Sequence, residues 1–320
     1  MNCLPPLWKW VFDMEFQHKS VLLRESIEGL DVKPGGVYID CTTGGGGHSL
    51  EIAARLGLAG TLFCFDQDSE AIEAAKKRLS EYSPIFVTRN FAEMGEVLAE
   101  YGVNKADGIL MDLGVSSYQL DNRERGFSYH DDAPLDMRMS GEGESARDVV
   151  NEYGDNELIR ILRLYGEEKY AVSIAKGITM AREIAPIETT SQLAEIIKSH
   201  VPMKARKEKN PCRKTFQAIR IEVNRELEVL EKGIASGFEL LSHGGRMAVI
   251  TFHSLEDRIV KNAFREYCTG CTCPPDFPVC VCGKKPRAVL VNKKPIEADE
   301  KELEENPRSR SAKLRILEKL

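Results

Sequence analysis

The chain has 320 residues, of which 42% are hydrophobic and 29% charged, and a formal net charge of -6. This composition is ordinary for a globular protein with a full core, and it excludes an intrinsically disordered class. No apolar run approaches the roughly 18 residues that a membrane span requires. The acidic balance excludes a protein that coats nucleic acid nonspecifically, although a local basic patch remains compatible with RNA binding.

The first thirteen residues lack the basic start, long apolar centre and small-residue cleavage site of a secretory signal. We therefore expect a cytoplasmic protein. Residues 1–13 are interpreted as an N-terminal extension of unassigned role.

Strand and helix signals alternate from Val37 onward, which is typical of a parallel sheet flanked by helices. Helices are expected at 49–56 and at 69–79, the second with Asp68 as N-cap. The expected strands, in chain order, cover residues 36–41, 61–65, 84–88, 108–111, 245–252, 287–291 and 314–317.

The alternation stops between residues 118 and 213, where helical periodicity occurs without a convincing buried strand. We interpret 14–117 and 214–320 as two parts of one α/β domain and 118–213 as an inserted helical substrate-recognition domain. Apolar residues at steps of three and four from Phe216 to Leu241 predict one long amphipathic helix after the insertion.

A glycine run, Gly44 to Gly47, lies between the first strand and its helix, where bare backbone lets a ligand approach a helix N-terminus. Asp66 lies 20 residues after Gly46, at the end of the second strand, which suits ribose hydroxyls. A dinucleotide site shares both features. Asp40 and Asp112, also at strand ends, favour instead the cationic S-adenosylmethionine. For each acid the alternative is a helix cap or turn.

Eight segments resemble the RsmH (MraW) family: HKSVLL at 18–23, TGGGGHS at 43–49, MDLGVSS at 111–117, RGFS at 125–128, PLDMRM at 134–139, KTFQAIR at 214–220, FHSLEDR at 252–258 and NPRSR at 306–310. The resemblance implies a class I, Rossmann-like methyltransferase domain interrupted by a helical domain. It also implies methylation of the exocyclic N4 of a cytidine in small-subunit (16S) ribosomal RNA, with that RNA or the small ribosomal subunit as partner.

Carried over by position, the resemblance implies that a set of residues surrounds the cofactor: Gly46, Gly47, His48, Asp66, Phe91, Asp112 and Gln119, to which the strand-end argument adds Asp40. Phe91 is expected to pack against the adenine or to be a core aromatic. The extension 1–13 and a cysteine-rich loop at 268–282 depart from the family, since not all members have them.

Cytosine N4 is a poor nucleophile because its lone pair is delocalised into the ring, so the chemistry needs a hydrogen-bond acceptor beside it. Asp112 is the first candidate, and the resemblance leaves its acceptor and cofactor roles unseparated. His253 is a second catalytic candidate, as a proton relay or an RNA contact. Ser254 and Asp257 match a capping box that starts the following helix.

Extracting a base costs a few kcal/mol, and aromatic stacking returns about 1 to 3 kcal/mol per base. Phe127, Tyr129 and Phe252 are the stacking candidates, with packing at the domain junction as the alternative. Gln217, Arg220 and Asn224 share one helix face, either solvated or facing substrate. The expected phosphate-binding side chains are Arg123, Arg125, Arg138, Lys204, Arg206, Lys207, Arg213 and Lys214.

Five of the nine cysteines fall between Cys268 and Cys282. Two C-x-C pairs, Cys271 with Cys273 and Cys280 with Cys282, suggest a tetrahedral zinc site. The spacing differs from the usual C-x-x-C, so a loop of reduced thiols without metal is the alternative.

Two other functions stay open at this stage. One is a methyltransferase acting on a small molecule or a protein. The other is a non-catalytic ribosome-assembly factor that binds RNA and keeps a vestigial cofactor pocket, against which the intact Asp40, Asp66 and Asp112 argue. The oligomeric state is not predicted.

Overall fold

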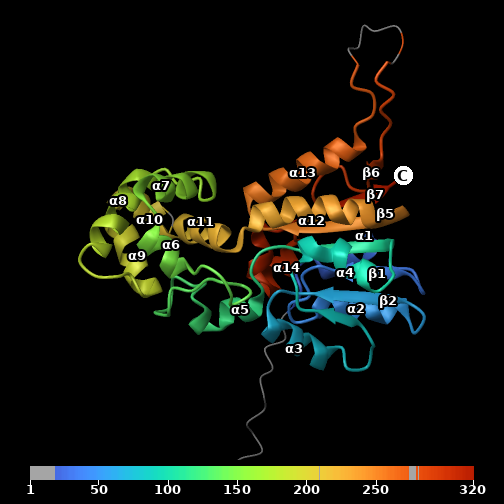
Figure 1. Ribbon diagram of the computed structural model, residues 1–320, viewed down its shortest axis with the longest axis horizontal. Helices are drawn as coiled ribbons and strands as arrows, with labels where there is room; N and C mark the ends of the chain where they lie inside the picture. Colours follow the sequence, from blue (N-terminus) through green and yellow to red (C-terminus); the bar gives the residue numbers. More distant parts are fainter. Residues whose placement is uncertain (1–18, 209, 274–278, 280) are drawn as a thin grey trace, which may run out of the picture.

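The computed structural model describes residues 19–208, 210–273, 279 and 281–320, so the extension 1–13 lies outside it. Figure 1 shows two bodies side by side: a sheet with helices on both faces, and a group of helices joined to one end of it. In the described residues, no helix combines the length and the hydropathy that crossing a bilayer requires.

The sheet has seven strands in the described residues, in the order β3-β2-β1-β4-β5-β7-β6. All neighbouring pairs from β3 to β5 are parallel, whereas β7 is antiparallel to both β5 and β6. The strands are β1 (Val37–Asp40), β2 (Thr61–Phe65), β3 (Ile85–Val87), β4 (Ala106–Asp112), β5 (Leu241–Thr251), β6 (Ala288–Leu290) and β7 (Lys313–Lys319).

Helices cover both faces of this sheet because successive strand residues point to opposite sides. Tyr38 joins the core under α1 (Leu23–Leu30), α2 (Gly47–Leu56) and α3 (Ser69–Arg78). Its neighbour Ile39 joins the other core, under α4 (Met94–Glu100), α12 (Glu226–Leu240) and α13 (Ser254–Cys268). The predicted α/β class is confirmed. Its crevice is expected where β1 separates β2 from β4, since the connections diverge there.

The helical body lies between β4 and β5 in the chain, as the break in periodicity predicts. It has its own apolar core, which includes Leu158, Ile174, Leu193 and Phe216. Its helices are α5 (Ser117–Asp121), α6 (Ala146–Glu152), α7 (Asp155–Leu164), α8 (Ala171–Arg182), α9 (Thr190–Ser199), α10 (Met203–Glu208) and α11 (Cys212–Asn224). Because α11 packs into this core, we propose that the inserted domain ends near Asn224.

The single long helix expected from Phe216 to Leu241 is wrong. Arg225 takes a left-handed conformation, with φ of 48°, and divides the segment into α11 and α12. α11 then packs with the helical body and α12 against the sheet. The apolar spacing continues across the break, and neither glycine nor proline marks it, so the periodicity alone did not show the division.

Candidate active site

The glycine run forms the turn between β1 and α2. Gly44 and Gly46 have positive φ values of 50° and 77°, a conformation that residues with a Cβ adopt at a cost. α2 begins at Gly47, two residues earlier than expected. A Cβ on Gly45 would meet nothing within 4 Å, so the turn presents bare backbone to open space.

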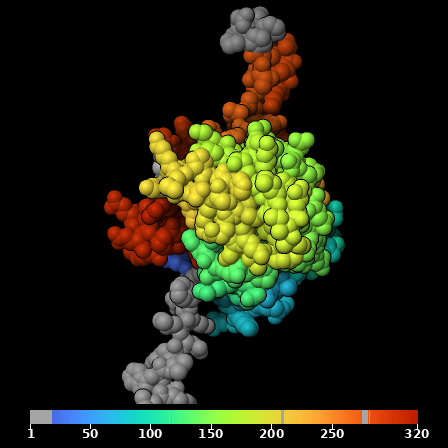
Figure 2. All heavy atoms as spheres, turned by 90° about the vertical axis from the view of Figure 1, so that its left-hand side faces the viewer, coloured from blue at the N-terminus to red at the C-terminus, as the bar shows by residue number. Residues whose placement is uncertain are grey.

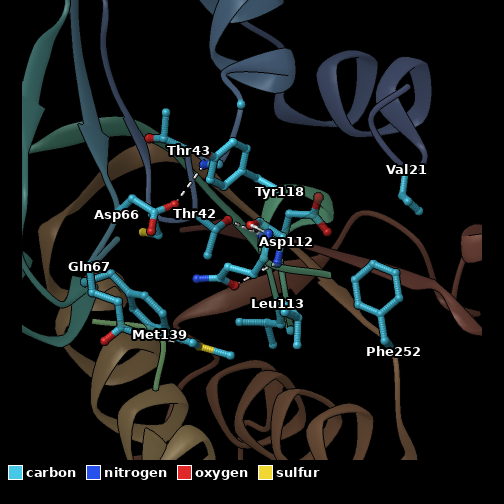
Figure 3. Close-up of a pocket in the computed structure, with 18 of the residues that line it drawn as sticks. Val21, Thr42, Thr43, Asp66, Gln67, Asp112, Leu113, Tyr118, Met139 and Phe252 are labelled. Atoms are coloured by element: carbon cyan, nitrogen blue, oxygen red, sulfur yellow. Dashed lines mark hydrogen bonds between the residues drawn. The ribbon is translucent and has the colours of Figure 1, made fainter. Parts of the chain in front are cut away.

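A cavity of about 410 Å³ opens beside this turn, at the carboxyl ends of β1, β2 and β4. Both bodies contribute to its wall: Asp66 and Asp112 come from the sheet, and Met139, Arg220 and Asn224 from the helical body. In the view of Figure 3, Asp112 lies between Asp66 on one side and Phe252 on the other. The volume is in the range of small-molecule sites.

Asp66 is positioned by two backbone groups. Its Oδ2 accepts a hydrogen bond from the Gly44 N–H at 2.8 Å, and its Oδ1 accepts one from the Asp68 N–H at 2.9 Å. Burial raises the pKa of Asp66 to about 6, and the two backbone hydrogen bonds counter that rise. Each oxygen keeps a lone pair for a ligand hydroxyl.

Asp112 ends β4 and lines the cavity. Its backbone N–H donates to Thr42 Oγ1 at 2.6 Å, which fixes the residue, while Oδ1 is buried with no hydrogen-bond partner in the described residues. Burial, followed by the charges of Asp40 and Glu256, raises the pKa of Asp112 well above its ordinary value. The backbone of Asp112 is thus fixed, while no hydrogen bond in the described residues engages its carboxyl Oδ1.

His48 is buried behind Asp112. Its Nε2 lies 3.1 Å from the Val21 carbonyl oxygen, which requires the proton on Nε2, and its Nδ1 lies 3.7 Å from Asp112 Oδ2. Burial lowers the pKa of His48 to about 4, so the ring is neutral at neutral pH. A neutral His48 leaves the charge of Asp112 uncompensated.

Asp40 is buried and is not among the residues that line the cavity. Its Oδ2 accepts from the Ser49 hydroxyl at 2.6 Å, and its Oδ1 accepts from the Thr42 N–H at 3.1 Å. The structure therefore places it beneath the glycine turn, where it holds the backbone. Gly46 is likewise absent from the cavity wall, whereas Gly47 and His48 are part of it.

Phe91 lines the cavity and packs on α12. A Cβ on Gly233 would overlap the Phe91 ring, so the glycine makes room for the aromatic wall. Gln119 also lines the cavity, and its Nε2 donates to Asp68 Oδ2 at 2.9 Å. The structure thus brings together Gly47, His48, Asp66, Phe91, Asp112 and Gln119 from the predicted cofactor set.

The predicted capping box at Ser254 and Asp257 is wrong by one residue. The N-cap of α13 is His253, whose Nδ1 accepts from the Glu256 N–H at 3.3 Å, while the Glu256 carboxylate accepts from the His253 N–H at 3.2 Å. Asp257 instead pairs with Arg315 at 2.8 Å. His253 is used at the helix start and does not line the cavity, so we assign it no part in the reaction.

Several residues predicted to bind RNA are engaged inside the protein. Arg125 donates to Asp68 Oδ2 at 2.8 Å and to the carbonyls of Arg138 and Met139 at 2.9 Å each, which joins the two bodies. Arg138 pairs with Asp136 at 2.6 Å. Phe127 is buried in the core of the helical body. Their ion pairs and packing leave them less available to phosphates or bases than predicted.

The polar face of α11 is likewise used internally. Gln217 donates to the Tyr165 carbonyl at 3.0 Å, and Arg220 forms a two-pronged ion pair with Glu226 at 2.7 and 2.9 Å. Asn224 donates to the Met137 carbonyl and accepts from the Met139 N–H, both at 2.8 Å. Arg220 and Asn224 still line the cavity; Gln217 does not.

The remaining basic residues predicted to bind RNA are exposed. Arg123 pairs loosely with Asp131 at 3.3 Å, and Lys214 donates to the Glu167 carbonyl. Others lie on or next to α10, in the helical body: Lys204, Arg206, Lys207 and Arg213.

The cavity wall also contains residues that we did not predict. Gln67 lines the cavity and accepts a hydrogen bond from Asn90 at 3.3 Å. It directly follows Asp66, the residue predicted to bind the ribose, and this position was an available signal. Arg308 reaches the wall from the 306–310 motif and pairs with Asp121 at 2.7 Å. Glu256 lies inside the 252–258 motif, which was an available signal, whereas Glu226 gave none, because only the fold brings it to the cavity.

Comparison with known proteins identifies the family to which the chain belongs. The model of the MraW methylase family matches residues 15–320. The chain belongs to the MraW methylase family. A ribosomal RNA small subunit methyltransferase H from Clostridium botulinum strain Kyoto is 55% identical to this MraW methylase over 309 residues, which cover 96% of this chain and 100% of that protein.

The protein of the same name from Ruminiclostridium cellulolyticum is 55% identical over 313 residues, which cover 96% of this chain and 100% of the relative. Among solved structures, a putative rRNA methylase from Clostridium thermocellum aligns with 95% of this MraW methylase and 100% of its own chain, at 12% identity and a TM-score of 0.45. The α/β body is a class I methyltransferase domain, and its cofactor is S-adenosylmethionine.

The cavity fits that cofactor. The bare backbone at Gly45 admits close approach, the Asp66 carboxyl has lone pairs for ribose hydroxyls, and Phe91 offers an aromatic surface. Asp112 lines the same cavity, and its carboxylate, when ionised, adds negative potential for a cationic ligand.

Proposed function

We propose that this MraW methylase transfers a methyl group to the exocyclic N4 of a cytidine in small-subunit ribosomal RNA. The observation that carries the proposal is the position of Asp112, which lines the cavity between the two bodies and whose carboxyl group has no hydrogen-bond donor at Oδ1 in the described residues. The names of the relatives support RNA of the small subunit as the substrate. The resemblance of the motifs favours the cytidine N4.

Asp112 would orient the amine and accept its proton. S-adenosylmethionine, when bound, supplies an electrophilic methyl group. Because the N4 lone pair is delocalised into the ring, the amine must be held in line with the methyl group before it can react. Positioning of this kind lowers the barrier by roughly 7 to 11 kcal/mol. By accepting a hydrogen bond from N4, Asp112 would orient the amine towards the methyl group. The raised pKa of Asp112 suits uptake of the amine proton as the bond between N4 and the methyl carbon forms.

Phe252 would hold the base. Of the three aromatic candidates, it alone lines the cavity, while Phe127 is buried and Tyr129 packs edge to face on Phe216 with ring centroids 5.5 Å apart. In Figure 3 the Phe252 ring lies across the cavity from Asp66. A ring at this place offsets part of the cost of extracting a base.

The exposed cations near α10 would contact phosphates outside the cavity. Lys204, Lys207 and Arg213 are exposed on the helical body, which also supplies the cavity wall through Arg220 and Asn224. Phosphate contacts at such a place set the register of an RNA strand without reading its sequence. In this proposal the helical body orients the RNA strand, and the residues at the edge of the sheet carry out the methyl transfer.

The test uses radiolabelled S-adenosylmethionine with small subunits, or naked 16S RNA, from a strain that lacks this gene. The labelled RNA is digested to nucleosides and compared with authentic N4-methylcytidine. Label in that nucleoside supports the proposal. Label in another nucleoside, label only in protein or small molecules, or no transfer to either RNA substrate would overturn it. The last outcome, with cofactor binding intact, would favour a non-catalytic RNA-binding factor.

A further inference from the structure

Three cysteines gather in an arm that leaves the α/β body between α13 and β6. The coloured part of this arm, within 269–273 and 281–287, projects away from the α/β body in Figures 1 and 2. The Sγ atoms of Cys271, Cys273 and Cys282 lie within 4.8 Å of one another. Cys280, the remaining member of the two C-x-C pairs, lies outside the described residues.

The sulfur spacing matches shared coordination of a metal. The Sγ atoms of Cys271 and Cys282 are 3.7 Å apart, at which distance the Cys282 thiol donates a hydrogen bond to Cys271 when no metal is bound. A disulfide needs about 2.05 Å. Two thiolates bound to one tetrahedral zinc, each at about 2.3 Å, are separated by about 3.8 Å. The pair therefore has the edge length of a zinc–sulfur tetrahedron.

The backbone around the cluster also favours thiolates. The Val281 N–H lies 3.4 Å from Cys273 Sγ and donates to it. Such a donor stabilises negative charge on sulfur, and it holds the segment that carries Cys282 against the segment that carries Cys273. Lys284 and Lys285 follow within three residues of Cys282 and favour an anionic cluster.

The described residues of the arm that follow its tip have little apolar burial to hold them in place. Val279 and Val281 are 70% and 74% exposed, and residues 281–287 are exposed throughout. Small segments without a core need a disulfide or a metal to fix their shape. A metal bound by the three sulfurs would connect the two segments of the arm that carry Cys273 and Cys282.

We propose that Cys271, Cys273 and Cys282 bind a structural Zn²⁺ ion that fixes this arm. Soft thiolates select zinc over magnesium or calcium, and zinc takes the tetrahedral geometry that the spacing matches. The three sulfurs fill three of the four positions. Each thiol loses its proton as its bond to zinc forms, so binding releases three protons and changes no oxidation state.

The experiment measures metal in the untagged, full-length protein, purified under reducing conditions without chelator. Elemental analysis should give about one zinc per chain. Cys271→Ser and Cys282→Ser should each lower this to below about a tenth. Cys268→Ser is the matched control, because Cys268 ends α13 close to the arm but does not belong to the cluster, and it should keep the metal.

Cobalt substitution tests the ligands directly. Zinc is removed with a chelator and replaced by Co²⁺, whose visible spectrum reports tetrahedral geometry and sulfur ligation. Thiolate-to-cobalt absorption in the wild type and in Cys268→Ser, with its loss in Cys271→Ser, supports the site. Stoichiometric iron in place of zinc, a disulfide within the cluster, or less than about a tenth of an equivalent of zinc with no cobalt spectrum would overturn it. Cofactor binding by every variant checks that the chain is folded.

Discussion

His48 Nδ1 lies 3.7 Å from Asp112 Oδ2, while the other ring nitrogen lies 3.1 Å from the Val21 carbonyl oxygen. Because that carbonyl needs a donor, the proton is on Nε2, and Nδ1 presents a lone pair to the carboxylate. The pKa of His48, lowered to about 4 by burial, keeps the ring in this state at neutral pH. Asp112 therefore has a neutral neighbour that neither neutralises its charge nor donates a hydrogen bond to it.

This arrangement predicts the effect of Asp112→Asn. The amide keeps the shape of the carboxyl but cannot take a proton, so kcat should fall by about 10² to 10⁴. The Kd for S-adenosylmethionine, measured by calorimetry, should rise far less than kcat falls. Equal losses in the two quantities would instead assign Asp112 to cofactor binding.

The same carboxyl predicts a pH profile. Asp112 accepts the proton only when ionised, and burial raises its pKa, so kcat/KM should rise with pH through a value above that of an ordinary carboxyl. Rates measured from pH 5 to 9 should show this ascending limb in the wild type. The residual activity of Asp112→Asn should lack it; a limb that persists in the variant would assign the titration to another group.

Gly233 on α12 predicts how the aromatic wall is held. Gly233→Ala places a methyl group where the Phe91 ring lies, so the ring must leave its place and the Kd for S-adenosylmethionine should rise by about tenfold. Gly237→Ala is a matched control one turn along the same helix, where the new Cβ meets the flexible end of Met247 at 2.8 Å. Both changes favour the helix equally, by about 1 kcal/mol. Equal affinities in the two variants would contradict a cofactor role for Phe91.

Sequence patterns predicted the sheet because apolar strands bounded by glycine and acidic turns are local signals. Asp66 and Asp112 were found for the same reason, since strand-end acids follow recognisable strands. Which acid faces the cavity was not predictable: Asp40 and Asp112 have the same local context, and only the Ser49 hydroxyl and Thr42 N–H show that Asp40 is occupied. The internal hydrogen bonds of Arg125 were not predicted because its partners Asp68 and Met139 are distant from it in sequence or contribute only backbone carbonyls.

Arg125 gives a prediction about stability. Its partner Asp68 is only 3% exposed, so Arg125→Met leaves a buried carboxylate without its cation and should lower the free energy of unfolding by about 3 kcal/mol. The control is Arg147→Met, which removes an exposed pair with Glu188 and should cost at most about 1 kcal/mol. Urea titrations measure both. Loss of RNA affinity at unchanged stability would restore Arg125 as a phosphate ligand.

Asp40 predicts a pH dependence of stability. Burial raises its pKa in the folded protein from 3.8 to about 6, so the folded state holds the proton more tightly than the unfolded state. Between these values the contribution of Asp40 to stability falls as pH rises, by roughly 3 kcal/mol in all. Asp40→Asn cannot ionise and is free of this loss. Its free energy of unfolding, relative to the wild type, should rise by most of that amount from pH 4 to 7.

A control of opposite sign comes from Glu73, whose exposed carboxylate has its pKa lowered by the hydrogen bond from Lys76. Its contribution is present at neutral pH and lost in acid, so the relative stability of Glu73→Gln should fall as pH rises. Urea titrations of both variants and the wild type at pH 4, 5, 6 and 7 measure the two slopes. A flat or falling difference for Asp40→Asn would mean that the Ser49 and Thr42 hydrogen bonds outweigh burial and keep this carboxylate ionised in the folded protein.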